Sequence, residues 1–531
     1  MADSDSMKKV LVGAKLQKTR GTPEEGPATA FIIPAAKVVM DPAREFAELE
    51  AENCGHIIAA IPLGYTVDFP LTIFGYPDKS FLGELMAMAI GPSTVVRRGS
   101  VGLASFVPSV PGTPGLNDAT AGGAYTGSAD AVYTVEIAAS GTPDTIKVKK
   151  DSGEYGTPLN ITSGAVAVGD GLTITFLATT GHEAGDIWKI KAFDTDVYRH
   201  TYTPADIPEV ATFWSSENAG QGKSGDTVCN RLDFKVPQNG EMQVTADLKG
   251  GSYEIVTDMG TPTAADYPAA EDSDSIFRSG IATLVYGETG AAIRTNLRTI
   301  DISIDRGIKP EEGRTQDKVS NANMYPEINR LTLEMEFLLT SLAELQRSWD
   351  GKDATAPTAT SPDWTETRLP TCNVKLVTPA IISSTIDSAI PASGNTSPND
   401  LTVSGTYTGQ VSVVKTIKIS TAGGTDKFQV KDGDGSYGAE ISMTGLAQDI
   451  GDGALLTFAT TTGHVKDDTF TITITVWNYE LELNIPDASV KFKPDQAGGR
   501  RVGNVTLTPI ATPADAPYTM YLQNTHSAAY T

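Results

Sequence analysis

The chain contains one segment twice, and this repeat constrains its fold more than any other feature. Gly123-Ala124-Tyr125-Thr126-Gly127 returns as Gly405-Thr406-Tyr407-Thr408-Gly409, an offset of 282 residues that holds without a gap as far as His182 and His464. Roughly a third of about 70 aligned positions are identical. Because chance does not produce an ungapped match of this length, we expect one small domain in two copies, at residues 121–193 and 399–475.

Each copy has the residue pattern of an all-β domain. Apolar side chains occupy every second position, the period of a strand with one buried face, in runs such as Leu172/Ile174/Phe176 and Trp188/Ile190. Gly and Asp clusters such as Gly169-Asp170-Gly171 separate these runs and are typical of hairpin turns, since both residues tolerate positive φ. The pattern predicts a two-sheet sandwich of immunoglobulin-like type, although the Cys–Trp–Cys hallmark of antibody domains is absent.

The residues around the two copies show a second, weaker symmetry. Both halves are predicted to run strand, long loop, strand, short helix, inserted domain and further strands. The predicted helix of the first half begins near Phe81 and is amphipathic, and that of the second half begins near Leu338 with its apolar residues on one face. We therefore expect a mainly β chain with two related domains, one formed by 1–120 and 194–291 and the other by 292–398 and 476–531. The alternative is that unrelated β domains happen to share this order.

Composition and charge exclude several classes of protein. The chain has 531 residues, with 41 Lys and Arg against 65 Asp and Glu, so its net charge is −24. That balance argues against a broad basic face that binds nucleic acid. The longest apolar runs, such as Ile57 to Leu63, are far too short to cross a membrane, and the first residues lack the pattern of a secretory signal. Three scattered cysteines predict neither disulfides nor a zinc site, which fits folding in a reducing cytoplasm.

Sequence motifs for catalysis or cofactor binding are weak throughout. Gln221-Gly222-Lys223-Ser224 resembles the end of a phosphate-binding loop, but position 217, where that loop needs Gly, is Glu. Asp432-Gly433-Asp434-Gly435 lacks the later residues of a calcium loop and is better interpreted as a turn. His182 and His464 each lie near an aspartate, Asp186 or Asp468, so a metal site is possible, but a turn histidine is the preferred interpretation. We expect no enzyme activity, no cofactor and no metal.

Four stretches outside the repeat carry a resemblance to a known family. They are Gly13 to Pro23, Cys229 to Pro237 with Val244 to Gly250, Leu297 to Gly307, and Leu483 to Pro486 with Arg501 to Leu507. Together they resemble the major tail tube protein of long, flexible-tailed bacteriophages. The repeated domains are similar to the immunoglobulin-like modules that decorate phage virion proteins. Their position inside the chain departs from simpler family members, which carry no insert or one at the C-terminus.

The resemblance implies a structural role in a virion tail. Tail tube subunits place their sheets edge to edge around a ring, rings stack through a long loop, and DNA passes down the bore without specific binding. The partners would be further copies of the chain, a tape measure protein and a tail terminator. A duplicated chain would form a trimer with pseudo-sixfold symmetry, and an unduplicated chain a hexamer. The acidic charge would then repel phosphate from the bore; the alternative is that it only keeps the protein soluble.

Two segments are candidates for the loop that contacts a neighbouring ring, 41–60 and 306–329, with a solvated hairpin as the alternative. The second carries mixed charges suited to such contacts: Arg306, Lys309, Glu311, Glu312, Arg314, Asp317 and Lys318. The alternative function is a capsid decoration protein or an adhesin that binds host-surface glycans.

Overall fold

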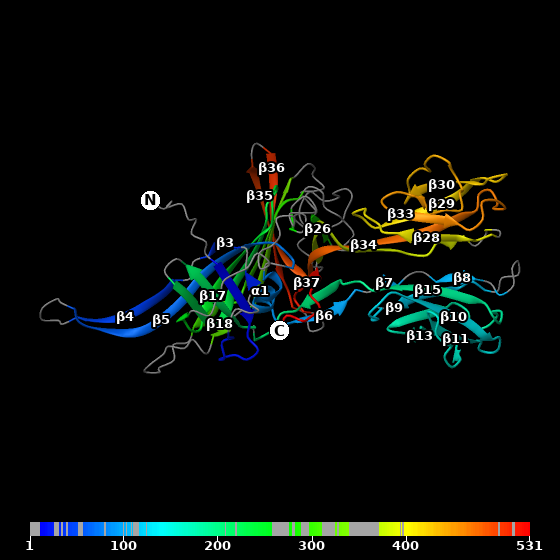
Figure 1. The fold of residues 1–531 in the computed structure, drawn as a ribbon. Coiled ribbons are helices and arrows are strands. Elements are labelled where there is room, and N and C mark those ends of the chain that lie inside the picture. Colours follow the sequence, from blue (N-terminus) through cyan, green and yellow to red (C-terminus); the bar gives the residue numbers. More distant parts are fainter. Residues whose placement is uncertain are drawn as a thin grey trace, which may run out of the picture. The chain divides into compact units, whose positions relative to one another are not determined.

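The computed structural model divides the chain into two compact units (Figure 1). The first unit comprises Met1–Val95, Arg199–Pro379 and Tyr479–Thr531, and the second comprises Val96–Tyr198 and Ala380–Asn478. The structure describes residues 11–25, 31–32, 35–38, 41–50, 57–78, 81–98, 100–101, 104–107, 109, 116–123, 125–207, 209–217, 220–256, 276–278, 282–287, 297–310, 324–326, 329–338, 371–392, 395, 398–497, 500–511 and 516–531. Strands dominate these residues, which contain one helix, so the mainly β class predicted from the sequence is confirmed.

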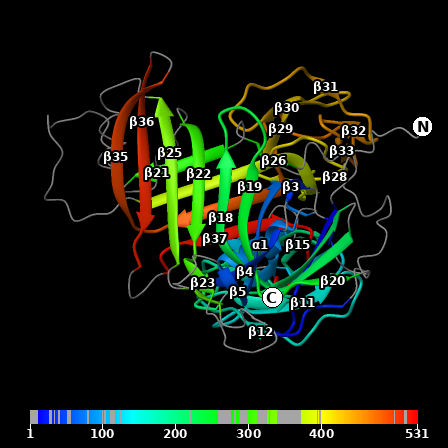
Figure 2. The same cartoon turned by 90° about the vertical axis from the view of Figure 1, so that its left-hand side faces the viewer.

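The first unit contains a long antiparallel sheet (Figure 2). Its main path runs β3 (Ala35–Val38), β5 (Ile57–Phe74), β19 (Gln243–Gly250), β18 (Gly220–Val236), β22 (Leu297–Asp305), β25 (Arg330–Leu338), β36 (Arg500–Pro509) and β35 (Ala488–Ala497). Five further strands extend it: β1 (Leu11–Leu16), β2 (Phe31–Ile32), β4 (Asp41–Glu50), β17 (Ala211–Glu217) and β20 (Glu254–Val256). Among the described strands, no sheet closes on itself.

The strand order of this path repeats. The first four strands, taken in chain order as one to four, lie in the order one, two, four, three: β3, β5, β19, β18. The next four lie in the same order: β22, β25, β36, β35. β18 pairs with β22, with Arg231 opposite Asp305 and Val236 opposite Ile300, so the two groups join edge to edge.

A second sheet and one helix complete the core of the first unit. The second sheet runs β21 (Ala282–Gly287), β26 (Thr371–Ile386), β34 (Thr469–Ile485), β37 (Thr519–Asn524), β16 (Tyr198–Tyr202) and β6 (Ser93–Arg97). α1 (Leu82–Ala89) is the helix predicted near Phe81, but all eight of its residues are buried, so it is not amphipathic as predicted. It is enclosed because both sheets contribute side chains to the single apolar core around it. The helix predicted beyond Leu338 lies outside the described residues.

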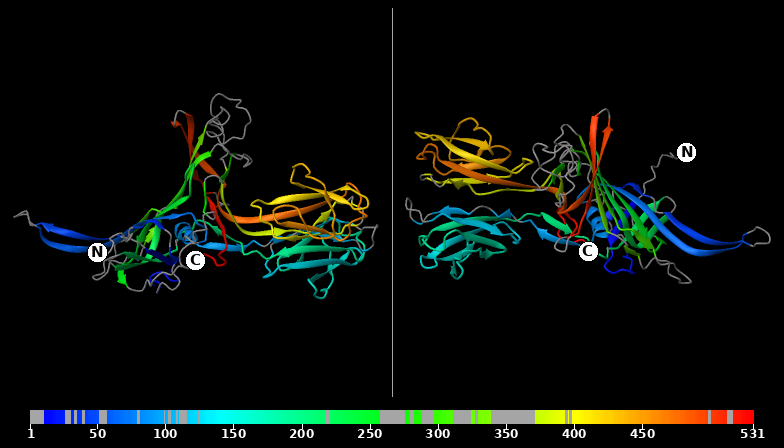
Figure 3. Two further views of the ribbon diagram at one scale, coloured as in Figure 1. Left: turned by 45° about the horizontal axis from the view of Figure 1, so that its top comes forward. Right: turned by 180° about the vertical axis from the view of Figure 1, so that it is seen from behind.

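The segment 41–60, predicted to be a long loop, is largely a β-hairpin. β4 pairs with the first part of β5, from Asp41 opposite Asp68 to Glu50 opposite Ile57, and the hairpin extends away from the rest of the sheet (Figure 3). The prediction was wrong because the Glu-rich β4 sequence has a low strand propensity, which pairing with the apolar first part of β5 overrides. The segment 306–329 also contains a short ribbon, β23 (Ile308–Pro310) with β24 (Met324–Pro326).

The second unit contains the two copies of the repeat, each with its own core. The first module, 96–198, has one sheet of β12 (Leu159–Asn160), β11 (Thr145–Lys150), β10 (Ala131–Ala139), β15 (Ile187–Phe193), β7 (Ser100–Val101) and β8 (Ser105–Val107), and another of β13 (Val166–Gly169), β14 (Leu172–Phe176) and β9 (Ala119–Gly123). Side chains from both sheets form one apolar cluster that includes Val135, Ile174 and Trp188. The module is thus a two-sheet β-sandwich.

The second module, 380–478, has matching strands. β31 (Ile441–Ser442), β30 (Lys427–Asp432), β29 (Val413–Thr421) and the start of β34 form one side, to which β27 (Ile390–Pro391) adds, and β28 (Leu401–Gly405), β33 (Ala454–Phe458) and β32 (Gln448–Asp449) form the other. Even the bulges correspond, because the β10–β11 register shifts between Ile137 and Ala139 and the β29–β30 register between Ile419 and Thr421.

The repeated Gly-x-Tyr-Thr-Gly motif has a packing reason. Gly405 has φ +94, and a Cβ there would collide with the carbonyl oxygen of Gly453. Tyr407 folds over Gly409, leaving no room for a side chain at that glycine, and its hydroxyl donates to the carbonyl of Val411. The first copy of the motif makes the same contacts, so both glycines and the tyrosine are needed to make this turn.

Candidate functional sites

The long sheet of the first unit has one apolar and one polar face. Side chains such as Phe234, Ile302 and Leu333 point into the core, so the residues between them point to the opposite face. There a groove of about 760 Å³ crosses four strands and reaches β35. We call this the polar sheet face; its hydrophilic lining residues are Arg231, Asp233, Lys235, Asp301, Ser303, Asp305, Arg330, Thr332, Glu334, Ser489, Lys491, Thr506 and Thr508.

Charges on the polar sheet face are mixed in sign. Four cationic and four anionic side chains line the groove, so it carries no excess of either charge. The Arg231 Nε lies 2.9 Å from Asp233 Oδ1, and Lys235 stands opposite Asp301 in the register. Burial raises the pKa of the Asp301 carboxyl, and Glu334 on the next strand raises it further, against a lowering by Lys235. The face therefore offers equal numbers of cationic and anionic side chains, together with hydroxyl groups, rather than a strongly acidic lining.

The predicted ring-contact residues fall mostly outside the part of the chain that the structure describes. Glu311, Glu312, Arg314, Asp317 and Lys318 are in this group. Lys309 lies in β23.

The predicted role of Arg306 in contact with a neighbouring ring is wrong, because its side chain is buried inside the first unit. It is 0% exposed, and its Nη1 donates to the Ile90 carbonyl oxygen over 3.4 Å. Its Nε and Nη2 have no hydrogen-bond partner among the described residues, and burial lowers the pKa of the guanidinium. The charge pattern suggested a surface loop, but Arg306 follows directly on β22 and points into the fold, so it cannot contact a neighbouring ring.

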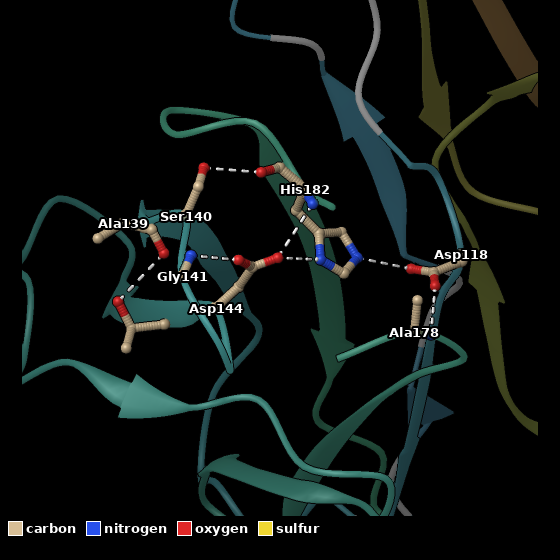
Figure 4. Close-up of polar contacts among 8 residues, drawn as sticks. Asp118, Ala139, Ser140, Gly141, Asp144, Ala178 and His182 are labelled. Carbon is tan, nitrogen blue, oxygen red and sulfur yellow. Dashed lines mark hydrogen bonds and ion pairs between the residues drawn. The ribbon is translucent and has the colours of Figure 1, made fainter. Parts of the chain in front are cut away.

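A buried histidine bridges two aspartates in the first module (Figure 4). The Nδ1 of His182 lies 2.9 Å from Asp144 Oδ2, and its Nε2 lies 2.9 Å from Asp118 Oδ1. An ionised carboxylate only accepts hydrogen bonds, so each of these contacts is a hydrogen bond that the ring donates when that nitrogen carries a proton. Backbone N–H groups hold both carboxylates: Gly141 donates to Asp144 and Ala178 to Asp118. We call this arrangement the His–Asp clasp.

The second module contains the same clasp. His464 Nδ1 lies 3.0 Å from Asp426 Oδ2, and its Nε2 lies 2.9 Å from Asp400 Oδ1. The side chain of His464 is 1% exposed and that of Asp426 is 0% exposed. Hydrogen bonds from Gly423 and His464 outweigh the opposing effect of burial and lower the pKa of the Asp426 carboxyl. The clasp ties the turn before the last strand to two other segments of each sandwich.

Both histidines precede the last strand of their module, as the preferred interpretation of a turn histidine predicts. In the first module the carboxylates that contact His182 are those of Asp118 and Asp144, whereas the nearby Asp186 accepts from the Ser109 N–H through its Oδ1. In the described part of the chain, no group of three or more His, Cys, Asp or Glu side chains is arranged to hold a metal ion. A usable signal existed: Asp118, Asp144 and His182 all recur at the offset of 282.

Lys223, in the motif that resembles a phosphate-binding loop, lies within the long strand β18. It is 3% exposed, and its Nζ lies 3.3 Å from Glu254 Oε1. A strand at this position does not form the loop that cradles phosphates. Within the described residues, no helix is both long and apolar enough to cross a membrane.

Comparison with protein families and with curated proteins identified no relative of this chain. No protein-family model matches the chain, and no curated protein aligns with it closely enough to count as similar.

Proposed function

We propose that this chain is a structural virion protein, the major tail tube subunit of a long-tailed bacteriophage. In this proposal three copies form a ring, rings stack into a tube, and the phage genome passes along the bore during ejection. The first unit forms the tube wall. The two modules of the second unit are immunoglobulin-like inserts that decorate its surface.

The repeated strand order of the long sheet carries this proposal. The β18–β22 junction already joins one four-strand group to the next within a single chain. β35 occupies the position in its group that β18 occupies in the first, and among the described strands it pairs only with β36. β3 corresponds to β22 and pairs only with β5. The β35 edge of one copy can therefore repeat the β18–β22 junction with the β3 edge of the next, a head-to-tail contact that closes into a ring.

The sequence of β35 shows which backbone groups are available at its outer edge. Pro494 has no N–H, and a proline within a strand is tolerated where that group would point away from the neighbouring strand. Backbone direction alternates along a strand, so the N–H group of Val490 also points to the outer edge, whereas those of Lys491 and Lys493 point to β36. Val490 is thus a donor for the next copy.

The extended β4–β5 hairpin suits contact between successive rings. It extends beyond the sheet that would form the ring wall. A hairpin of this length can reach the next ring while its base stays fixed by β3 and β19.

Electron microscopy of the purified full chain at high concentration tests the proposal. We expect rings or tubes of uniform bore with threefold symmetry. Val490→Pro should abolish them while leaving the subunit folded, because it removes an outer-edge donor and spares the β36 ladder. Val490→Ala, which keeps the donor, is the matched control and should still assemble. A chain that stays monomeric at every concentration, or Val490→Pro rings identical to those of the unmodified protein, would refute the proposal.

A further inference from the structure

We propose that the first module binds an acidic polysaccharide on the outer face of β11, β10 and β15. This inference does not depend on tube assembly, because it rests on side chains within one module. The face carries four lysines, Lys147 and Lys149 on β11 and Lys189 and Lys191 on β15, with Tyr155 beside them. We call it the lysine face.

The register places the lysines in two rows on either side of β10. Lys149 and Lys189 both stand opposite Thr134, one on each neighbouring strand, and Lys147 stands opposite Glu136. Strand spacing puts the two rows about 10 Å apart, and successive lysines in a row about 7 Å apart. Such spacing leaves room for one extended polymer chain between the rows.

Most of the positive charge on the lysine face is uncompensated. Lys147 Nζ lies 2.9 Å from Glu136 Oε1. Within the described residues, no carboxylate lies within 4.0 Å of the ammonium groups of Lys149, Lys189 or Lys191. Lys149 Nζ instead lies 4.8 Å from the centroid of the Tyr155 ring, which leaves its charge available. A concentration of cations on one face of a protein of net charge −24 favours an anionic partner.

The second module provides a natural comparison. At the offset of 282, Gln429, Thr471 and Thr473 replace Lys147, Lys189 and Lys191. Lys418, which faces the same way, is paired with Asp467 over 2.7 Å. The two modules share their strands, bulges and clasp, so the charge of this face differs while the scaffold does not.

The geometry favours a polysaccharide over other polyanions. A peptide normally binds by adding to a sheet edge, but both edges of β10 are already paired, to β11 and to β15. A DNA duplex, whose major groove alone is about 12 Å wide, is broader than the space between the lysine rows. A flexible polysaccharide with spaced carboxylates meets neither obstacle.

Binding of fluorescently labelled polygalacturonate to the full chain tests the inference, with neutral dextran, duplex DNA and polyglutamate as comparison polymers. The triple variant Lys147→Gln, Lys189→Thr, Lys191→Thr copies the second module and should lower affinity for polygalacturonate at least about tenfold at low salt. The reciprocal variant Gln429→Lys, Thr471→Lys, Thr473→Lys should add a binding site and raise the stoichiometry. Binding should weaken as salt rises.

Each other outcome overturns the inference. If neither variant changes the affinity or the stoichiometry, the lysine face is not the site. If the chain binds only duplex DNA or only polyglutamate, the occupant is wrong. If it binds none of the charged polymers at low salt, the face is not a polyanion site at all.

Discussion

Replacing His182 with leucine should strongly destabilise the first module. The substitution removes the imidazole ring that lies between Asp118 and Asp144, with each ring nitrogen 2.9 Å from a carboxylate oxygen. Two hydrogen bonds to charged groups, at about 1.5–3 kcal/mol each, are lost, and an uncompensated charge is left in the interior. Removal of one member of a buried ion pair costs about 3–5 kcal/mol, so we expect a loss of about 4 kcal/mol. For a domain of this size, that lowers the unfolding temperature by roughly 15–30 °C.

Calorimetry of the full chain measures this loss, and the second module supplies the control. His464→Leu should lower a different transition by a similar amount, and the double variant should lower both. The fluorescence of Trp188 reports on unfolding of the first module, because this side chain is buried and its counterpart in the second module is Phe470. The centroids of the Trp188 and His182 rings lie 5.9 Å apart. The Trp188 fluorescence change should shift only with His182→Leu.

The pH dependence distinguishes electrostatic loss from lost packing. Burial opposes ionisation of Asp144, but hydrogen bonds from Gly141 and His182 outweigh it and lower the carboxyl pKa below 3.8. A group whose pKa is depressed on folding contributes stability that is present above its unfolded pKa and lost as the pH falls below it. The difference between the unmodified protein and His182→Leu should be complete near neutral pH and should shrink below about pH 4. A change of less than about 1 kcal/mol at neutral pH, or a gap that is equally large well below pH 3.8, would refute this account of the clasp.

Three further substitutions test other parts of the structure. Burial raises the pKa of Glu84 to about 7 from 4.5, so the stability contributed by its protonated carboxyl is lost as the pH rises through that range. In urea unfolding, the free energy of unfolding of Glu84→Gln relative to the unmodified protein should grow by about 3 kcal/mol between pH 4.5 and pH 8.5. A difference that stays constant with pH would contradict the assignment. Arg306→Met should leave the first unit equally or more stable in urea, because it replaces a poorly bonded buried charge; a loss above about 1 kcal/mol would show that the guanidinium is well compensated. Gly405→Ala should lower the free energy of unfolding of the second module by about 2 kcal/mol, and with it the unfolding temperature of that module alone, because φ is +94 and the methyl group meets the Gly453 carbonyl. An unchanged unfolding temperature would show that the turn can rearrange.

Local patterns in the sequence predict the strands of the modules well and the hairpin poorly. The alternation in Leu172/Ile174/Phe176 matches the buried, half-buried alternation of β14, because each apolar side chain there meets the opposite sheet. The sequence of β4 has no comparable alternation, and β4 is found as a strand paired along its length with β5. The residue pattern therefore predicts a strand that has its own apolar face, and it does not predict a strand whose sequence lacks one and which forms by pairing with a neighbour.

The clasp was missed for a different reason. Asp144 and Asp118 lie 38 and 64 residues before His182, so proximity along the chain pointed to the wrong aspartate. Only the fold of the sandwich brings the three together. The repeat held the missing information, because two copies that diverge at most positions retain all three residues. The buried position of Arg306 had no such signal, since it sits at the start of a charged run in the sequence.

The balance of charges on the polar sheet face changes how a bore could avoid retaining DNA. An excess of carboxylates was expected from the net charge of −24, yet the groove holds equal numbers of cations and anions. A cation binds phosphate less well when a carboxylate already contacts it, as Asp233 does for Arg231. If this face lines the bore, its low affinity for DNA would come from carboxylates that stand in equal number beside its cations. Removing a carboxylate such as Asp233 would then expose an arginine to the passing phosphates, and genome passage would slow without any change in tube assembly.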